Sequence, residues 1–253
     1  MVKIKAIVFD LDGTIYCGNK LLENTLDVIK QLKEYNIKIF FMSNNSTSNV
    51  KSISNKLNNM GFNYEWEAIY SSGSAAIRYL NEKAIKEVYL VGMDNFKEEI
   101  CNQGISIIDN EYKAKNMLIG LTNFNYDILT RAVRAAINSD NIIACNKDRN
   151  YIGNEGLLYP GCGSIVVPIE WCSGKKITKS IGKPDTTMLE MLCKDNKLSR
   201  EEIVVVGDSY ETDICAANNF SCKSILIGSN VNAKYCVNNI AGIMPILYPE
   251  SDS

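Results

Sequence analysis

Three short apolar segments, each ending in a polar group, constrain the fold of this chain more than any other feature of its sequence. They are residues 6–9 before Asp10, residues 37–42 before Ser43, and residues 202–206 before Gly207-Asp208. Short apolar runs of this kind are typical of buried strands, and helical patterns follow them. Strands that alternate with helices over short connections indicate a parallel sheet covered by helices. We therefore expect an α/β fold with a doubly wound parallel sheet.

Helical patterns connect these strands. We expect helices over residues 25–35, 48–60, 73–82, 185–195 and 211–219, and a further strand over residues 224–227. Asn24 is suited to cap the first helix, and Gly61 is suited to end the second. Pro184 is expected in the first turn of the fourth helix, where its missing N–H does no harm. The last residues, with Pro245 and Pro249, indicate a short strand or a loop.

The middle of the chain carries secondary structure of its own. Strands are expected at residues 88–92, 116–120 and 142–144, and helices at residues 94–102, 126–138 and 163–173. That is enough for a separate α/β module inserted between two halves of one sheet. We therefore expect residues 1–80 and 179–253 to form a core and residues 81–178 to form an inserted α/β cap domain.

Charge and hydropathy restrict the classes of partner. The 253 residues have a net charge of -2 and no basic block, which argues against binding to nucleic acid or to a membrane surface. No apolar stretch approaches the roughly 18–20 residues of a membrane span. The N-terminal apolar run breaks at Asp10, too early for a signal peptide. We expect a cytoplasmic protein.

The sequence contains no histidine, and this restricts its chemistry sharply. Ser-His-Asp and Cys-His catalysis, His-ligated zinc and an imidazole general base are all excluded. The nine cysteines form no Cys-x-x-Cys pair, so most are expected to be small buried hydrophobes. Any metal site would most naturally use oxygen ligands, which favours magnesium or a similar hard cation.

The polar groups at the strand ends are expected to meet. Sites in open parallel α/β sheets form at the carboxyl ends of the strands, which brings Asp10, Ser43 and Asp208 together. Asp12 lies on the same side of an extended segment as Asp10, and adjacent carboxylates repel unless a cation lies between them. Each segment alone has a simpler explanation, since Asp, Ser and Asn are common in turns. Together with Lys183, however, these residues have matching chemistry.

That chemistry is phosphoryl transfer. A carboxylate can attack a phosphate and form an aspartyl-phosphate intermediate, and this attack requires positive charge nearby. Magnesium held by Asp10 and Asp208, with Lys183 as a point charge, would supply it. The Ser43 hydroxyl and backbone N–H groups of the turn from Asp12 onward would hold the phosphate oxygens. Asp12 would protonate the leaving alcohol and later activate water.

Four segments, in this order, resemble the motifs of the haloacid dehalogenase (HAD) superfamily: Asp10-Leu11-Asp12-Gly13-Thr14, Ser43-Asn44-Asn45, Gly182-Lys183-Pro184 and Gly207-Asp208-Ser209-Tyr210-Glu211-Thr212-Asp213. The insertion between the second and third motifs resembles that of the NagD-type (subclass IIA) phosphatases. It contains Asn146, Asp148 and Pro160-Gly161-Cys162-Gly163-Ser164. The resemblance extends over about residues 3–230, and it implies a Rossmann-like core with a cap.

The resemblance also implies a role for each motif residue. Asp10 would be the nucleophile, and Asp12 the general acid and base. Phosphate or substrate would be bound by Thr14, Ser43, Asn44, Asn45, Lys183, Asn146 and Asp148. Magnesium would be held by the side chains of Asp10 and Asp208 and the backbone carbonyl of Asp12. Asp213 would support the metal through water or orient its neighbours.

The inserted module would act as a lid that excludes water and selects the leaving group. Here the sequence departs from the family pattern. Cys145 and Lys147 stand where related proteins often have Thr and Pro, and Thr122 replaces a frequent Asp. These differences leave the chemistry intact and the substrate open. Lys147 either meets an anionic substrate or is simply solvated, and the solvated arrangement is the simpler expectation.

We therefore expect a magnesium-dependent phosphatase that acts on small phosphorylated metabolites, either sugar phosphates or nucleoside monophosphates. One alternative is a phosphotransferase, which would pass the same intermediate to an acceptor alcohol. Another is a non-catalytic signalling protein that carries a phosphorylated aspartate, as receiver domains do, although a receiver domain is shorter and has no inserted lid. Contacts between lids offer a route to a homodimer, which no residue pattern here establishes.

Overall fold

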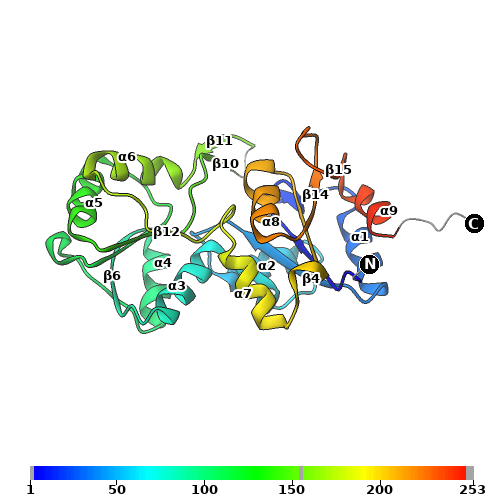
Figure 1. Cartoon of the computed structure of the whole chain (residues 1–253), viewed down its shortest axis with the longest axis horizontal. Helices are drawn as coiled ribbons and strands as arrows, with labels where there is room; N and C mark the ends of the chain where they lie inside the picture. The colour runs from blue at the N-terminus through cyan, green and yellow to red at the C-terminus, as the bar shows by residue number, and fades with distance from the viewer. Residues whose placement is uncertain (1–2, 154–155, 249–253) are drawn as a thin grey trace, which may run out of the picture.

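The computed structural model describes residues 3–153 and 156–248, which form two parallel sheets flanked by helices (Figure 1). The first sheet has six strands in the order β15-β14-β13-β1-β4-β5, all parallel to their neighbours. These strands are β1 (Ala6–Phe9), β4 (Lys38–Ser43), β5 (Ile69–Ser71), β13 (Ile203–Gly207), β14 (Lys223–Ile227) and β15 (Cys236–Val237). The three strands with polar ends are therefore adjacent, and β1 lies in the middle.

Helices cover both faces of the six-stranded sheet, so the expected doubly wound architecture is confirmed. The helices beside it are α1 (Thr25–Glu34), α2 (Val50–Asn59), α3 (Ser72–Glu82), α7 (Thr187–Asn196), α8 (Cys215–Phe220) and α9 (Ile243–Leu247). Alternate residues of a strand point to opposite faces. Ile7 and Phe9 accordingly share a hydrophobic cluster with α1 and α2, whereas Ala6 and Val8 share one with α3, α7 and α8.

The second sheet has five parallel strands in the order β12-β9-β8-β6-β7, in the left half of Figure 1. Its strands are β6 (Glu87–Val91), β7 (Ser106–Ile107), β8 (Asn116–Ile119), β9 (Asn141–Ala144) and β12 (Lys179–Ser180), with the helices α4 (Asp94–Asn102), α5 (Tyr126–Asn138) and α6 (Gly163–Ser173). The six elements expected in the middle of the chain are confirmed to within one residue. β12 extends this sheet past residue 178, and the division into core and cap stays a prediction.

One hydrophobic cluster extends across both sheets. It joins Val8 of β1 and Met42 of β4 to Val88 of β6 and Leu118 of β8, with Leu80 of α3 among them. All five side chains are almost completely buried. The two sheets therefore share apolar packing and are not joined by connecting chain alone.

Shorter elements complete the fold. Two antiparallel hairpins are formed by β2 (Tyr16–Cys17) with β3 (Lys20–Leu21) and by β10 (Asn150–Ile152) with β11 (Leu158–Pro160). Single helical turns occur at η1 (Trp66–Ala68), η2 (Glu111–Lys113), η3 (Arg200–Glu202), η4 (Tyr210–Ile214) and η5 (Ile240–Gly242). Among residues 3–153 and 156–248, none of the helices is both long and apolar enough to cross a membrane.

Several local expectations are wrong for physical reasons. Asn24 precedes α1, but its φ of 63° is left-handed and its side chain makes no capping hydrogen bond, whereas side-chain capping needs an extended backbone there. Pro184 lies before α7, which begins only at Thr187. The chain end forms α9, with Pro245 in its first turn, where no intrahelical bond is lost. Pro249 lies outside the described residues.

Candidate active site

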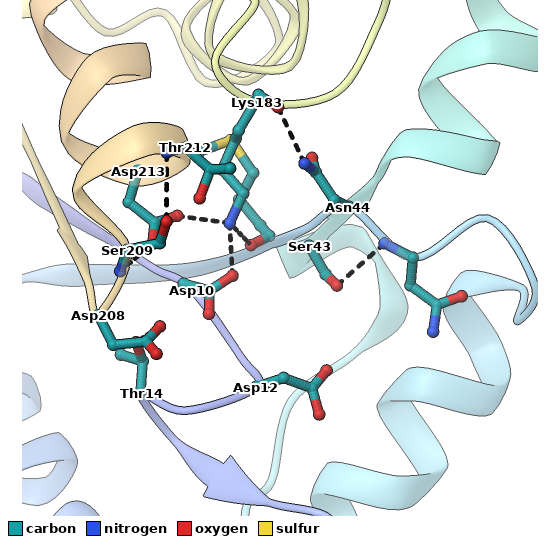
Figure 2. Close-up of polar contacts among 12 residues, drawn as sticks. Asp10, Asp12, Thr14, Ser43, Asn44, Lys183, Asp208, Ser209, Thr212 and Asp213 are labelled. Atoms are coloured by element: carbon teal, nitrogen blue, oxygen red, sulfur yellow. Dashed lines mark hydrogen bonds and ion pairs between the residues drawn. The ribbon is translucent and has the colours of Figure 1, made fainter. Parts of the chain in front are cut away.

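The carboxyl ends of β1, β4 and β13 meet where the chain turns to opposite sides of the six-stranded sheet. In open α/β sheets, ligands bind at this kind of position. Asp10 follows β1, Ser43 is the last residue of β4, and Asp208 follows β13. Lys183 reaches the same place from the segment after β12. Figure 2 shows these side chains grouped around Asp10.

Lys183 is the central cation of this site. Its side chain is 3% exposed, and its Nζ donates hydrogen bonds to Asp10 Oδ1, to Asp213 Oδ1 at 2.6 Å and to the Met42 carbonyl at 3.2 Å. Burial alone would lower the pKa of Lys183, but Asp10 and Asp213 together raise it above its ordinary value. The ammonium group therefore stays charged and is held by three acceptors.

The charged form of Asp10 is disfavoured by its surroundings. Burial raises the pKa of its carboxyl well above the ordinary value, Lys183 opposes this shift, and the charges of Asp213 and Asp208 add to it. Carboxylate oxygens of these three aspartates all lie within 4.8 Å of one another. One buried ammonium does not neutralise three carboxylates at this separation.

The residues present fit a hard divalent cation, because the donor set consists of carboxylate oxygens, which magnesium prefers. Asp208 is exposed at the edge of the cluster, and Thr14 Oγ1 donates a hydrogen bond to its Oδ1 at 3.3 Å. Asp208 also packs directly on Gly13, where a Cβ would lie 2.2 Å from Oδ2. Asp10, Asp208 and Asp213 are therefore the side chains able to hold such an ion.

Asp213 is placed by an unusual local structure. It lies in a widened helical turn, Tyr210–Ile214, that precedes α8. Its Oδ2 accepts a hydrogen bond from the Ser209 backbone N–H at 3.1 Å, and its Oδ1 accepts one from Lys183 (Figure 2). The residue is 1% exposed. Asp213 therefore fixes the lysine and the neighbouring backbone at the same time.

Asp12 stands apart from this network. Figure 2 draws no interaction between Asp12 and the Asp10–Lys183 group, although the two aspartates are two residues apart. Asp12 is exposed as a residue, yet desolvation by the surrounding protein raises the pKa of its carboxyl, and Lys56 and Tyr16 oppose that shift. A carboxyl with a raised pKa that faces solvent is suited to give and take protons.

The segment after β4 has two different kinds of contact. The Ser43 Oγ accepts a hydrogen bond from the Asn45 backbone N–H at 3.2 Å (Figure 2). The Asn45 side chain is occupied in its own turn, where Oδ1 accepts from the N–H groups of Thr47 and Ser48, both at 2.8 Å. Of these residues, Ser43 alone presents its side-chain oxygen among the groups drawn around Asp10.

Asn44, Asn146 and Asp148 join the two halves of the molecule. Asn44 Nδ2 donates to Asp148 Oδ1 at 2.8 Å and to the Lys183 carbonyl at 2.9 Å. Asn146 Nδ2 donates to the Asn44 carbonyl at 2.6 Å, and its Oδ1 accepts from the Asp148 backbone N–H at 3.1 Å. The segment that follows β9 is thereby fixed beside the segment that follows β4. Their contact with substrate stays a prediction, and Lys147 between them is exposed.

Two residues at the site are absent from the expectations above. Tyr16 donates a hydrogen bond from its hydroxyl to Asp12 Oδ2 at 3.4 Å, and Lys56 Nζ lies 3.8 Å from the centre of the Tyr16 ring. The available signal was the position of Tyr16, four residues after Asp12 and two residues past the end of the first motif. A buried tyrosine beside a strand is otherwise indistinguishable from an ordinary core residue.

Comparison with known proteins agrees with this geometry. Residues 7–106 match the family described as haloacid dehalogenase-like hydrolase, and residues 180–242 match a second HAD-hydrolase-like model. The chain is 31% identical over 223 residues to sugar-phosphatase AraL of Bacillus subtilis, which covers 87% of this chain and 82% of that protein. The chain belongs to the haloacid dehalogenase-like hydrolase family. The four motif segments of this HAD hydrolase all fall inside the matched ranges.

Further similarities are to a second sugar phosphatase and to NagD proteins. An acid sugar phosphatase of Staphylococcus saprophyticus is 28% identical over 236 residues, covering 92% of this chain and 90% of that protein. NagD from E. coli K-12 has the same fold, with a TM-score of 0.83, 23% identity, and coverage of 95% of this chain and 98% of that one. A protein described as a putative NagD protein is 25% identical to this chain, with a TM-score of 0.88 and coverage of 96% of this chain and 98% of that one, and the expected NagD-type resemblance is confirmed.

Proposed function

We propose that this HAD hydrolase is a magnesium-dependent phosphatase that acts on small phosphate monoesters, with sugar phosphates as the favoured class and nucleoside monophosphates as the second. The observation that carries the proposal is Asp10, held at the carboxyl end of β1 between the Lys183 ammonium and two further carboxylates. The names of the two curated relatives, both sugar phosphatases, support the substrate class.

Asp10 is the proposed nucleophile. Lys183 holds it through Oδ1, so the other carboxylate oxygen attacks the phosphorus atom. The bond between phosphorus and the ester oxygen breaks, and the departing oxygen takes a proton from Asp12. Asp12 then removes a proton from water, whose oxygen attacks the phosphorus. The bond to Asp10 breaks in that step, and inorganic phosphate leaves while Asp12 keeps the proton for the next cycle.

Magnesium would be held by the side chains of Asp10 and Asp208, with Asp213 beside them. The backbone carbonyl of Asp12 is proposed as a further ligand. When bound, it supplies the positive charge that lets a carboxylate and a phosphate dianion approach each other. Lys183 adds a second positive charge whose position does not depend on the metal.

Phosphate oxygens are proposed to bind the Ser43 hydroxyl, Thr14 and the backbone N–H of Asp12, since the N–H groups of Gly13 and Thr14 already donate within the turn. Asn44 and Asp148 are proposed to set the distance between this phosphate site and the lobe of residues 81–178. That lobe is proposed to act as the lid that selects the leaving group. A cytoplasmic location belongs to the same proposal, since small phosphorylated metabolites are found there.

The test is phosphate release from a panel of sugar phosphates, nucleoside monophosphates and p-nitrophenyl phosphate, with magnesium and with EDTA. We expect turnover with magnesium, none with EDTA, and none for Asp10→Asn. Asp140→Asn, which changes an exposed carboxylate before β9, is the matched control and should keep full activity. Absence of phosphate release from every ester, or an active Asp10→Asn, would overturn the proposal. Phosphate found on an added acceptor alcohol instead of in solution would identify a phosphotransferase.

A further inference from the structure

We infer that Tyr16 is a positioning residue for Asp12: its phenol occupies Asp12 Oδ2, so the proton that Asp12 transfers is carried on Oδ1. This inference rests on the proposed function, in which Asp12 is the general acid and base. It assigns a role to a residue that contacts no reacting atom itself. Tyr16 would act by fixing which carboxyl oxygen faces the leaving group.

The backbone holds Tyr16 and Asp12 in a fixed relationship. Tyr16 is the first residue of β2 and is 4% exposed. The Gly13 N–H donates to the Tyr16 carbonyl at 2.7 Å, and the Tyr16 N–H donates to the Leu11 carbonyl at 3.2 Å. The turn between the two residues is therefore closed on itself. The phenol reaches Asp12 Oδ2 at 3.4 Å from this fixed base.

The donor and acceptor groups of Tyr16 and Asp12 decide which carboxyl oxygen of Asp12 carries the proton. A phenol keeps its proton at neutral pH, because its ordinary pKa is about 10. The hydroxyl of Tyr16 donates to Asp12 Oδ2. A phenol oxygen can also accept, but it is the weaker acceptor because its lone pair is delocalised into the ring. An oxygen that carries a proton is a poorer acceptor than the carbonyl oxygen of the same carboxyl group, so a phenol that donates to Oδ2 favours the form of Asp12 with its proton on Oδ1. The arrangement resembles the way in which one partner of a histidine selects its tautomer.

The Lys56 ammonium lies over the face of the Tyr16 ring. It belongs to α2, and its Nζ lies 3.8 Å from the ring centre. A cation over an aromatic face is attracted to the ring, and it also blocks rotation of the ring into that space. Asp12 is thereby linked through Tyr16 to a helix outside the first motif. Lys56 also acts on Asp12 directly through its charge, and the contact with Tyr16 predicts an additional effect on the reaction that is smaller than the effect of Tyr16 itself.

The experiment compares two esters that differ in their need for a proton. A sugar phosphate releases an alkoxide that requires general acid catalysis, whereas p-nitrophenolate leaves readily without a proton. The quantity compared is kcat/KM, because it covers only the steps up to departure of the alcohol. For Tyr16→Phe we expect kcat/KM to fall about tenfold on the sugar phosphate and less than about threefold on p-nitrophenyl phosphate, a fraction of the effect of a general acid.

Tyr64→Phe is the matched control, because the Tyr64 hydroxyl is buried and, within the described residues, has no hydrogen-bond partner. It should leave kcat/KM unchanged on both esters. Lys56→Met keeps the aliphatic stem of the side chain. It should lower kcat/KM more on the sugar phosphate than on p-nitrophenyl phosphate, by a smaller factor than Tyr16→Phe does. An equal loss of kcat/KM on the two esters in Tyr16→Phe and in Lys56→Met would overturn the inference while the proposed function stands. So would an unchanged kcat/KM in Tyr16→Phe. A wild-type protein inactive on both esters would overturn the proposed function and the inference together.

Discussion

A Cβ on Gly13 would lie 2.2 Å from Oδ2 of Asp208, a separation that real side chains do not reach. Gly13 also has a φ of +92°, which glycine adopts more readily than other residues. Glycine at this position therefore lets the turn after Asp12 close against a carboxylate that is proposed to hold magnesium. The packing of two motifs that are far apart in sequence depends on one missing methyl group.

Gly13→Ala should abolish most activity, because the new methyl group displaces the Asp208 carboxylate. We expect kcat/KM to fall at least about a hundredfold, comparable to loss of a catalytic electrostatic contact. The magnesium concentration for half-maximal activity should rise in the same variant. Both quantities follow from magnesium titrations of phosphate release.

Gly104→Ala is the control for backbone strain. Gly104 has a φ of +75°, but nothing lies within 4 Å of the position of its Cβ. Gly104→Ala should lower the free energy of unfolding by about 1–2 kcal/mol for a left-handed alanine, and Gly13→Ala by at least as much. Only Gly13→Ala should change the magnesium requirement. An equal loss of activity in Gly104→Ala would contradict the explanation.

Lys183→Met should be strongly destabilising as well as inactive. It leaves Asp10 and Asp213 buried without their shared ammonium, and removal of one partner of a buried ion pair costs about 3–5 kcal/mol. Lys179→Met is the matched control, since its ion pair with Asp185 at 2.9 Å is partly exposed and contributes about 0–1 kcal/mol. Urea unfolding in EDTA measures both. Similar losses in the two variants would show that the Lys183 pairs add nothing beyond a surface contact.

The ion pair between α3 and α7 predicts a pH-dependent part of the stability. The hydrogen bond from Arg78, at 2.6 Å, lowers the pKa of Asp195 below its ordinary value. The charged form is favoured in the folded state, so the pair stabilises the fold above the ordinary Asp pKa of about 3.9. This stability is lost as the pH falls through the lowered folded value.

Asp195→Asn should therefore lower the free energy of unfolding by about 0.5 kcal/mol at pH 7, the range of a largely exposed pair. The difference from the wild type should shrink as the pH falls toward about 3. Urea unfolding at a series of pH values checks both statements. A difference that stays constant with pH would assign the loss to something other than the charge of Asp195.

The reactivity of the cysteines toward alkylating reagents should follow their exposure. Cys17, Cys101, Cys172 and Cys236 are exposed, whereas Cys145, Cys162 and Cys193 are buried. Burial raises the pKa of Cys162 to about 12 and that of Cys193 to about 11, so their thiolates are scarce at pH 8. Alkylation followed by mass spectrometry should label the exposed set first. Early labelling of Cys162 would contradict the packing of α6 on its sheet.

Long periodic segments were predictable from sequence because burial repeats along them. The helix at residues 126–138 and the strand at residues 142–144 match α5 and β9 closely. Short elements were missed, among them β5 (Ile69–Ser71), because three residues carry no period. Pro245 was interpreted as a helix breaker, but it stands in the first turn of α9, where the missing N–H has no intrahelical acceptor.

The site was likewise predictable from the sequence only in part. That Asp10, Ser43 and Asp208 lie together follows from three strand ends in one parallel sheet. The direction of a loop side chain does not follow from strand order. Asn44 turns toward Asp148, and Tyr16 turns toward Asp12, because of turn geometry that no periodic pattern encodes.

The hydrophobic cluster shared by the two sheets makes the inserted lobe a poor candidate for exchange between relatives. A chimera that replaces residues 81–178 would place foreign side chains against Val8 of β1, Met42 of β4 and Leu80 of α3. Cavities or overpacking of a methylene or two there would cost about 1–3 kcal/mol each. Substitutions cost much less stability at exposed positions such as Lys147 and Arg149. Diversification of this protein is therefore expected to proceed by single substitutions in loops and not by replacement of a whole lobe.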